Sequence, residues 1–277
     1  MAKDLSHVRQ YFIELILWWE GCINCKTLEQ QFSITRQQAN TDLKTYTSHY
    51  PNNTTKISGT YYSADTFIAY YITPNINIYL HWFATKDITT HSSFADNVSC
   101  LVLPPRKVSH NIIRVLISAI RHKQRIEVDY VSLANPENDG RIFHPHTFVN
   151  TGSRWHIRGY CEKSQNFRDL VLSRFRGEAE LIDASTIDPQ QDLAWHTQVN
   201  LILQPDPRLS PAKQAVLAND YQMEGGQLVM STRAALAQYL LHELQVNTKM
   251  LDGTPEAQQL VLGKRSIKRW SPISSSF

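Results

Sequence analysis

The pattern of apolar residues near the start of the chain is that of an amphipathic helix. Apolar side chains recur at steps of three or four residues, which places Val8, Phe12, Leu15 and Trp19 on one face. Gly21 follows as a residue that commonly ends a helix. We therefore expect a helix that buries one face against the rest of an N-terminal domain.

Two short helices and a hairpin are predicted next. Thr27 and Thr35 each precede a glutamine by three residues, the spacing of a capping box at a helix N-terminus. The helix from Thr35 has an apolar stripe made of Ala39, Leu43 and Tyr46. Residues 56–62, with a turn at Ser58-Gly59, have the pattern of a β-hairpin. This order of elements is the plan of a winged helix-turn-helix.

The exposed face of the helix from Thr35 carries side chains that can recognise DNA bases. Arg, Gln and Asn hydrogen-bond the edges of guanine and adenine in the major groove. This face contains Arg36, Gln37, Asn40, Thr41 and Lys44. It holds no glutamate, and Asp42 lies beside the apolar stripe, where it can face away from DNA. The other interpretation is a solvated helix face in a protein-binding domain.

A connecting region follows up to residue 124. Ile76, Ile78 and Leu80 alternate with other residues, which predicts a strand. Pro104-Pro105 marks a boundary, and residues 108–122 then have the pattern of a helix with Ile112, Val115, Leu116 and Ala119 facing inward. Such a helix is placed to carry a signal between two modules.

The segment from Arg125 to Arg176 combines strand-like alternation with many arginines and aromatic residues. Arg154, His156, Arg158 and Tyr160 alternate with Trp155 and Ile157, and Arg168, Leu170, Leu172 and Arg174 share a face in the next predicted strand. Short strands with close turns predict a small β-barrel. Guanidinium groups among aromatic rings suit a phosphate-bearing ligand. The alternative is a solvated exterior whose arginines pair with Glu127, Asp129, Glu162 and Asp169.

The last part of the chain, residues 196–277, has a mixed pattern. Strands are predicted at 199–203 and 228–230, and helices at 211–218 and 233–246. Leu236, Leu240 and Leu244 form a stripe along the second helix. We expect a ferredoxin-like α+β domain with a dimerisation surface.

Composition and charge narrow the class of protein. Of the 277 residues 42% are hydrophobic and 19% charged, as in ordinary soluble proteins. The longest apolar run, Tyr11 to Trp19, is broken by Glu14 and is too short to span a membrane. A charged N-terminus and four irregularly spaced cysteines favour a cytoplasmic protein. Residues 105–185 hold thirteen Lys and Arg against nine Asp and Glu, so the positive excess lies in the middle segment.

The candidate metal and catalytic patterns are weak. Cys22 and Cys25 have the spacing of a zinc knuckle, but no second pair follows. His144 and His146 share a strand face without a carboxylate or thiol nearby. Ser132 with His144 is a conceivable catalytic pair, yet no nucleophile, phosphate-loop or dinucleotide motif is present. We expect no metal, no cofactor and no enzymatic activity.

The middle segment resembles a WYL domain, an Sm-like barrel that follows helix-turn-helix modules in bacterial regulators. The likeness rests on residues 130–132, 141–145, 154–161 and 168–175, with Trp155-His156-Ile157 at the position of the Trp-Tyr-Leu motif. Residues 1–73 resemble the winged helix-turn-helix of these regulators, and residues 195–246 resemble their C-terminal dimerisation extension. The layout is most similar to WYL repressors encoded beside phage-defence systems such as BREX and CBASS.

The resemblance implies a homodimeric repressor that binds an inverted-repeat operator upstream of a defence operon. It implies a winged helix-turn-helix at residues 1–94, a linker helix at 95–124, a WYL domain at 125–190 and a dimerisation domain at 191–277. Thr35, Arg36, Gln37, Gln38, Asn40 and Thr41 would contact DNA, with Lys44 and Lys56 on phosphates. A nucleotide or nucleic-acid effector would bind Tyr130, Ser132, Arg141, His144, His156, Arg158, Arg168 and Arg174.

Two other functions fit the same sequence. The barrel itself could bind RNA or single strands, with the N-terminal domain serving protein interaction. The chain could also be an enzyme that acts on a phosphate group.

Overall fold

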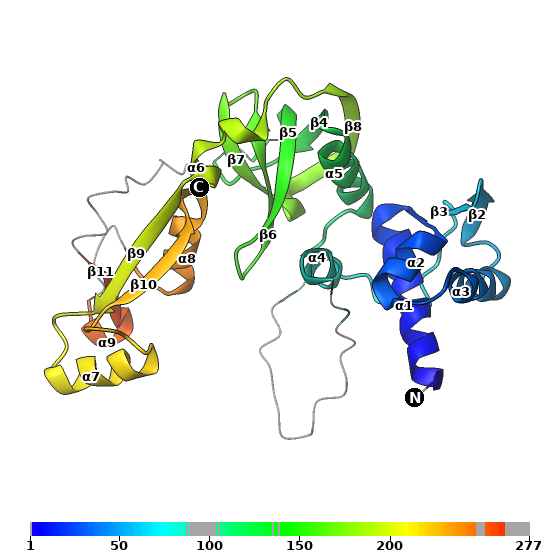
Figure 1. Cartoon of the computed structure of the whole chain (residues 1–277). Helices are drawn as coiled ribbons and strands as arrows, with labels where there is room; N and C mark the ends of the chain where they lie inside the picture. The colour runs from blue at the N-terminus through cyan, green and yellow to red at the C-terminus, as the bar shows by residue number, and fades with distance from the viewer. Residues whose placement is uncertain are drawn as a thin grey trace. The chain divides into compact units, whose positions relative to one another are not determined.

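The computed structural model of the chain describes residues 2–86, 88, 104, 106–134, 136–137, 139–247 and 253–263, and side chains from residue 6 onward (Figure 1). The chain forms two compact units. One comprises residues 1–130, 139–145 and 171–184, and the other comprises residues 131–138, 146–170 and 185–277. The predicted boundary at residues 94 and 95 lies outside the described residues, as does Cys100. The four-part division given above stays a prediction.

The N-terminal elements follow the predicted order. They are α1 (Ala2–Glu20), β1 (Cys22–Ile23), α2 (Cys25–Phe32), α3 (Arg36–His49), β2 (Thr54–Ile57) and β3 (Thr60–Ser63). The hairpin of β2 and β3 is extended by β1 into a sheet of order β1-β3-β2. Phe12, Leu28 and Leu43 are buried where the three helices meet. The predicted winged helix-turn-helix arrangement is confirmed.

The helix caps explain where α2 and α3 begin. The Thr35 hydroxyl accepts a hydrogen bond from the backbone N–H of Gln38 at 3.2 Å, as the sequence predicted. The cap of α2 was predicted wrongly at Thr27. Its backbone N–H donates instead to the Asn24 side chain at 3.2 Å, so the helix begins earlier. Ser33, at a φ of 52°, forms the turn between the two helices.

Glu14 is a fully buried carboxylate that fixes the chain after the wing. It accepts hydrogen bonds from the backbone N–H groups of Tyr70, Tyr71 and Ile72 at 2.6 to 3.1 Å. The Tyr46 hydroxyl of α3 donates to it at 3.0 Å. A buried carboxylate is tolerated when several donors satisfy it. Glu14 therefore joins α1, α3 and the segment at 70–72.

The strand predicted at residues 76–80 is wrong, because this segment is helix α4 (Ile76–Thr85). The alternation of three apolar residues also fits one face of a helix, and a short run does not distinguish the two periods. Asn75 caps the helix through the N–H of Asn77. The Trp82 ring lies 5.1 Å from the Phe12 ring in an edge contact. The packing of α4 on α1 therefore stabilises a helix here rather than a strand.

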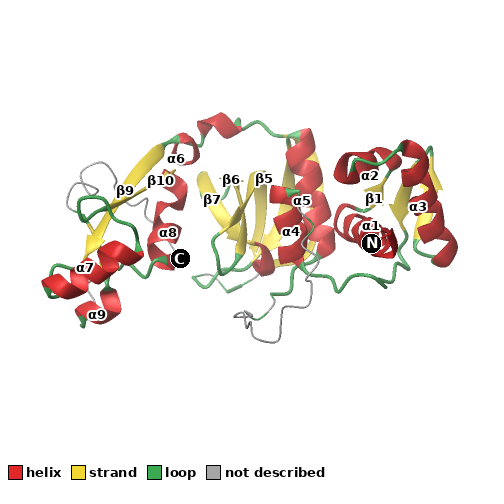
Figure 2. Ribbon diagram, turned by 60° about the horizontal axis from the view of Figure 1, so that its bottom comes forward, coloured by secondary structure: helices red, strands yellow, loops and turns green. Residues whose placement is uncertain are grey.

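The central elements form one helix and one sheet. They are α5 (His110–His122), β4 (Gln124–Tyr130), β5 (Asp139–Asn150), β6 (Trp155–Cys161), β7 (Asn166–Val171), the 3₁₀ turn η1 (Leu172–Arg174) and β8 (Phe175–Ala184). The strand order is β7-β6-β5-β4-β8, and α5 packs on β4 and β8 (Figure 1). Figure 2 labels β7, β6 and β5 side by side in this order. Among the described residues the sheet has two edges, so the predicted barrel is not confirmed. Leu172 and Arg174 lie in η1, and their predicted place on a strand face with Arg168 is wrong.

Helix α5 is fixed to α1 by Arg114, which the sequence analysis did not single out. Its guanidinium donates to the backbone carbonyls of Leu17 at 2.8 Å and Trp18 at 2.8 and 3.1 Å. These carbonyls belong to the last turn of α1, where backbone donors run out; the Leu17 carbonyl also accepts a hydrogen bond from the Gly21 N–H at 3.2 Å. Arg121 adds an ion pair to Glu20 at 2.7 Å, near the protein surface. The predicted connecting helix is confirmed, and it contacts both α1 of the N-terminal module and the sheet.

We expect Arg114→Met to lower the free energy of unfolding of the N-terminal module by about 2 kcal/mol. The substitution keeps most of the apolar stem but leaves two carbonyls without their charged donor. Arg121→Met is the matched control and should cost less than about 1 kcal/mol, because Arg121 is half-exposed. Urea denaturation of the full chain measures both. Equal effects of the two substitutions would contradict this role of Arg114.

The C-terminal elements are α6 (Leu193–His196), β9 (Gln198–Pro205), α7 (Pro211–Asp220), β10 (Leu228–Arg233), α8 (Ala237–Glu243), α9 (Pro255–Gln258) and β11 (Leu260–Leu262), with the 3₁₀ turns η2 (Pro189–Gln191) and η3 (Ala234–Leu236). The sheet order is β10-β9-β11. Leu201, Leu203 and Leu241 form its core. The predicted helix 233–246 is shorter, and it buries Ala237 and Leu241 rather than the predicted leucine stripe. The ferredoxin-like topology is not confirmed.

Candidate functional site

The outward face of α3 is polar and open to solvent. Thr35, Arg36, Gln37, Gln38, Thr41 and Lys44 are exposed, and Asn40 is half-buried. Within the described part of the chain, we find no side-chain hydrogen bond or ion pair for Arg36, Gln37, Asn40 or Lys44. Lys56 is exposed on the wing, with its ammonium group 4.8 Å from the centre of the Tyr61 ring.

Three of the predicted DNA contacts already have partners inside the protein. The Thr35 hydroxyl caps α3, and the Thr41 hydroxyl donates to the carbonyl of Gln37 at 3.0 Å. The Gln38 amide donates to the Asp42 carboxylate at 3.1 Å. The side chains that the structure leaves available on α3 are therefore Arg36, Gln37, Asn40 and Lys44.

Asp42 is buried and points toward α1. The Arg9 guanidinium donates to its carboxylate at 2.7 and 3.4 Å, and the Gln10 amide donates to its backbone carbonyl at 3.2 Å. Arg9 therefore neutralises the Asp42 carboxylate on the side of α3 that faces α1, away from the exposed face. Because of this arrangement, α3 presents no negative charge near Arg36 and Asn40.

The eight predicted effector positions are divided between the two compact units. Tyr130, Arg141, His144 and Arg174 belong to the first unit, and Ser132, His156, Arg158 and Arg168 belong to the second. Whether all eight form one pocket stays a prediction.

In the first unit, Arg141 and Tyr130 form a cation–π pair. The guanidinium carbon lies 4.9 Å from the centre of the Tyr130 ring, and the Tyr130 hydroxyl accepts a hydrogen bond from the backbone N–H of Val171 at 3.0 Å. Arg141 also contacts Asp139 at 3.4 Å, but its buried Nε atom has no hydrogen-bond partner among the described residues. His144 is buried, and Arg174 is half-buried at the end of η1.

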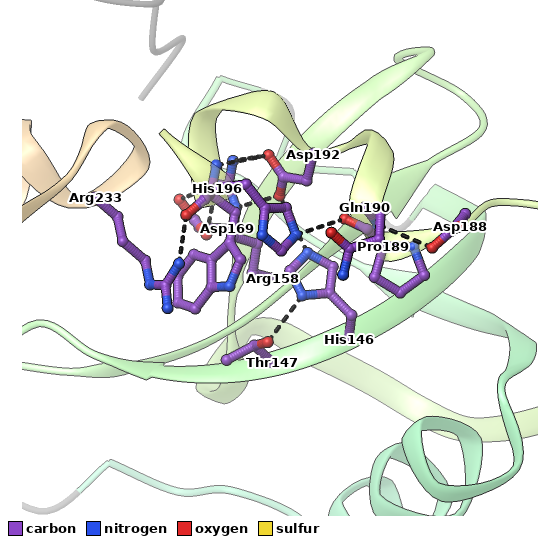
Figure 3. Close-up of polar contacts among 11 residues, drawn as sticks. His146, Thr147, Arg158, Asp169, Asp188, Pro189, Gln190, Asp192, His196 and Arg233 are labelled. Carbon is purple, nitrogen blue, oxygen red and sulfur yellow. Dashed lines mark hydrogen bonds and ion pairs between the residues drawn. The ribbon is translucent and has the colours of Figure 1, made fainter. Parts of the chain in front are cut away.

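In the second unit, Arg158 is buried between two carboxylates (Figure 3). Its Nε and one terminal nitrogen donate to both oxygens of Asp192 at 2.6 and 2.9 Å. Its other terminal nitrogen donates to Asp169 at 3.0 and 3.1 Å. The Asp169 pair was foreseen as the alternative to ligand binding. The Asp192 pair was missed, because Asp192 lies 34 residues further along the chain.

Asp192 also has partners besides Arg158. His146 Nε2 lies 3.1 Å from its carboxylate, and the backbone N–H of Trp195 donates to it at 3.1 Å, which makes Asp192 the N-cap of α6. Burial opposes ionisation of Asp192, but the hydrogen bonds from His146 and Arg158 outweigh it and lower the pKa of this carboxyl to about 2. Asp192 is therefore ionised at neutral pH.

The other members of this group are His156, Arg168 and Ser132. The His156 ring is buried with its centre 5.2 Å from that of Tyr239, and the Tyr239 hydroxyl donates to Asp169 at 3.3 Å. Arg168 Nε donates to the Ser164 hydroxyl at 3.4 Å, and Ser132 is half-buried. The described residues contain no cluster of side chains suited to hold a metal ion. None of their helices has the length and apolar character that a membrane span requires.

Three family models match the chain in the order predicted. The BrxR transcriptional regulator winged helix-turn-helix domain matches residues 6–85, the WYL domain matches residues 111–179, and the BrxR C-terminal dimerization domain matches residues 198–267. The DNA-binding transcriptional repressor CapW of Pseudomonas aeruginosa is 34% identical over 93% of this chain and 88% of its own length. The chain belongs to the CapW family.

Two further CapW repressors are similar over most of their length. The protein of Escherichia coli strain KTE188 is 32% identical over 92% of this chain, and that of Stenotrophomonas maltophilia is 28% identical over 95%. These matches cover 87% and 91% of the length of those relatives. The predicted membership in the WYL-domain regulators is confirmed.

Proposed function

We propose that the chain is a homodimeric transcriptional repressor that binds an inverted-repeat operator through α3 and the wing. The observation that carries this proposal is the exposed face of α3. Arg36, Gln37 and Asn40 are available there, while Asp42 is held inward by Arg9. The C-terminal match to a dimerisation domain and the names of the CapW relatives support it. A phage-defence operon is the proposed target.

We further propose that an anionic effector, a nucleotide or nucleic-acid fragment, regulates DNA binding through the WYL domain. Arg141 supports this because its buried Nε is a donor whose acceptor is missing among the described residues. Arg168, Arg174, His144, His156, Ser132 and Tyr130 complete the proposed site with Arg158. The same proposal includes closure of the central sheet into an Sm-like barrel. It also includes a ferredoxin-like topology for the C-terminal domain.

We prefer this function to direct binding of RNA or single strands by the barrel. A protein that binds single-stranded nucleic acid through charge presents its arginines along an open groove. Arg158 is buried and paired with two carboxylates, so its guanidinium does not face such a groove.

The test of the repressor function is binding to the chain's own upstream DNA at about 150 mM salt. Fluorescence anisotropy and footprinting should show tight binding and protection of two half-sites about one helical turn, or a multiple of it, apart. A shuffled duplex of the same composition is the control. Equal affinity for both duplexes, or protection of a single half-site by a monomer, would contradict the proposal.

A further inference from the structure

Each nitrogen of the Arg158 guanidinium donates to one of the protein's own carboxylates. Asp192 takes the edge formed by Nε and one terminal nitrogen, and Asp169 takes the other terminal nitrogen. The edge that Asp192 uses offers two parallel donors, which is the geometry that binds a phosphate bidentately. An effector phosphate and Asp192 therefore compete for the same two donors.

Charge makes the two anions mutually exclusive. Arg158 is one guanidinium shared by two carboxyl groups, Asp169 and Asp192, and all three side chains are at most 11% exposed. Burial raises the pKa of the Asp169 carboxyl, and the adjacent Arg158 guanidinium opposes that shift. Adding a phosphate to this buried group would place three acidic groups around one guanidinium, which electrostatic repulsion and burial oppose. A phosphate can therefore bind here only if a carboxylate leaves.

Asp192 is the carboxylate that can leave more easily. Asp169 lies on β7, within the central sheet, and also accepts a hydrogen bond from Tyr239. Asp192 lies between η2 and the four-residue helix α6, in a segment whose side chains are mostly exposed. Moving such a segment breaks fewer backbone hydrogen bonds than moving a sheet strand.

Departure of Asp192 would also loosen contacts that lead into the C-terminal sheet. Asp192 caps α6 through the N–H of Trp195. The Arg233 guanidinium lies 4.5 Å from the centre of the Trp195 ring and donates to the Trp195 carbonyl at 2.6 Å. Arg233 is the last residue of β10 in the C-terminal sheet. A chain of direct contacts thus runs from Arg158 through Asp192 and Trp195 to Arg233 of β10; Figure 3 labels Arg158, Asp192 and Arg233.

We propose that Asp192 is an internal substitute for the effector's phosphate. In the unliganded protein it holds Arg158 and caps α6. A phosphate or phosphodiester that binds the Nε edge of Arg158 displaces Asp192, uncaps α6 and releases the Trp195–Arg233 contact with β10. The effector signal then reaches the dimerisation domain first. This inference rests on the proposed regulation by an anionic effector.

The test compares Asp192→Asn with Asp188→Asn in the full-length chain. Asp188 is an exposed matched control that caps the neighbouring turn η2 through the N–H of Gln190 and does not contact Arg158. Titration with inorganic phosphate, followed by calorimetry, should show affinity on the order of tenfold to 100-fold higher for Asp192→Asn, because a competing ionic hydrogen-bonded pair is removed. Adding Arg158→Met to Asp192→Asn should abolish that gain.

A second measurement on the wild type does not depend on the folding of any variant. Hydrogen exchange should accelerate in residues 193–197 and in β10 when phosphate saturates the protein, and should stay unchanged in α3. Equal phosphate affinity of the two Asn variants, a gain that survives Arg158→Met, or unchanged exchange at 193–197 would each overturn the role of Asp192. Operator binding by the phosphate-free wild-type protein is measured separately, and its absence would count against the repressor function alone.

Discussion

Replacing Arg36 and Asn40 together with alanine is expected to weaken operator binding by 100-fold or more. Both side chains are available near the start of α3, where a recognition helix contacts bases. A bidentate contact from Arg to guanine or from Asn to adenine contributes about 1–3 kcal/mol to discrimination. Loss of two such contacts removes most of the advantage of the operator over other DNA. Fluorescence anisotropy at about 150 mM salt measures the effect.

The control variant removes one arginine and one asparagine side chain outside α3. Arg176→Ala with Asn166→Ala changes the net charge equally, and both residues are exposed on the central sheet. This pair should bind the operator within about twofold of wild type. If the α3 variant also stays within twofold, α3 is not the helix that recognises the operator.

Glu14→Gln is expected to destabilise the N-terminal module by about 3 kcal/mol. The change keeps the size of the side chain, so no cavity forms. It removes the negative charge that accepts hydrogen bonds from three backbone N–H groups and the Tyr46 hydroxyl. The amide NH₂ that replaces one oxygen is itself a donor and faces some of these donors. Urea denaturation followed by tryptophan fluorescence should show an earlier transition for this module, because Trp18, Trp19 and Trp82 all belong to it.

Asp65→Asn is the control for the loss of one negative charge in the same module. Asp65 is exposed, and such surface substitutions usually change stability by less than about 0.5 kcal/mol. A transition for Glu14→Gln at the same urea concentration as for Asp65→Asn would show that Glu14 does not anchor the segment at 70–72. Operator binding should fall in parallel with the folded fraction, since Glu14 is buried and does not lie on the exposed face of α3 that is proposed to contact DNA.

Predictions that depended on neighbouring residues agree well with the structure. The helix from Thr35 begins where its cap was expected, because the cap is a contact between residues three apart. The hairpin at residues 54–63 forms around the predicted turn. The connecting helix to His122 also agrees, since its apolar stripe is long enough to establish the helical period.

Predictions that depended on distant partners failed or were missed. Alternation at residues 76–80 suggested a strand, whereas contact between Trp82 and Phe12 stabilises a helix. Glu14 was noted only as an interruption of an apolar run. A charge within an apolar run indicates a buried group with partners, but its hydroxyl donor Tyr46 lies 32 residues later and its backbone donors lie more than 55 residues later.

The sequence alone determined the order of the modules, the polar face of α3 and the arginine–aromatic segment, because each is encoded in residues close together along the chain. Tertiary structure decided which of those side chains are available. Asp42 faces Arg9, and Arg158 is held by Asp192, in pairs separated by 33 and 34 residues. Burial decides the charge state and the partners of such groups, and burial depends on how distant segments pack.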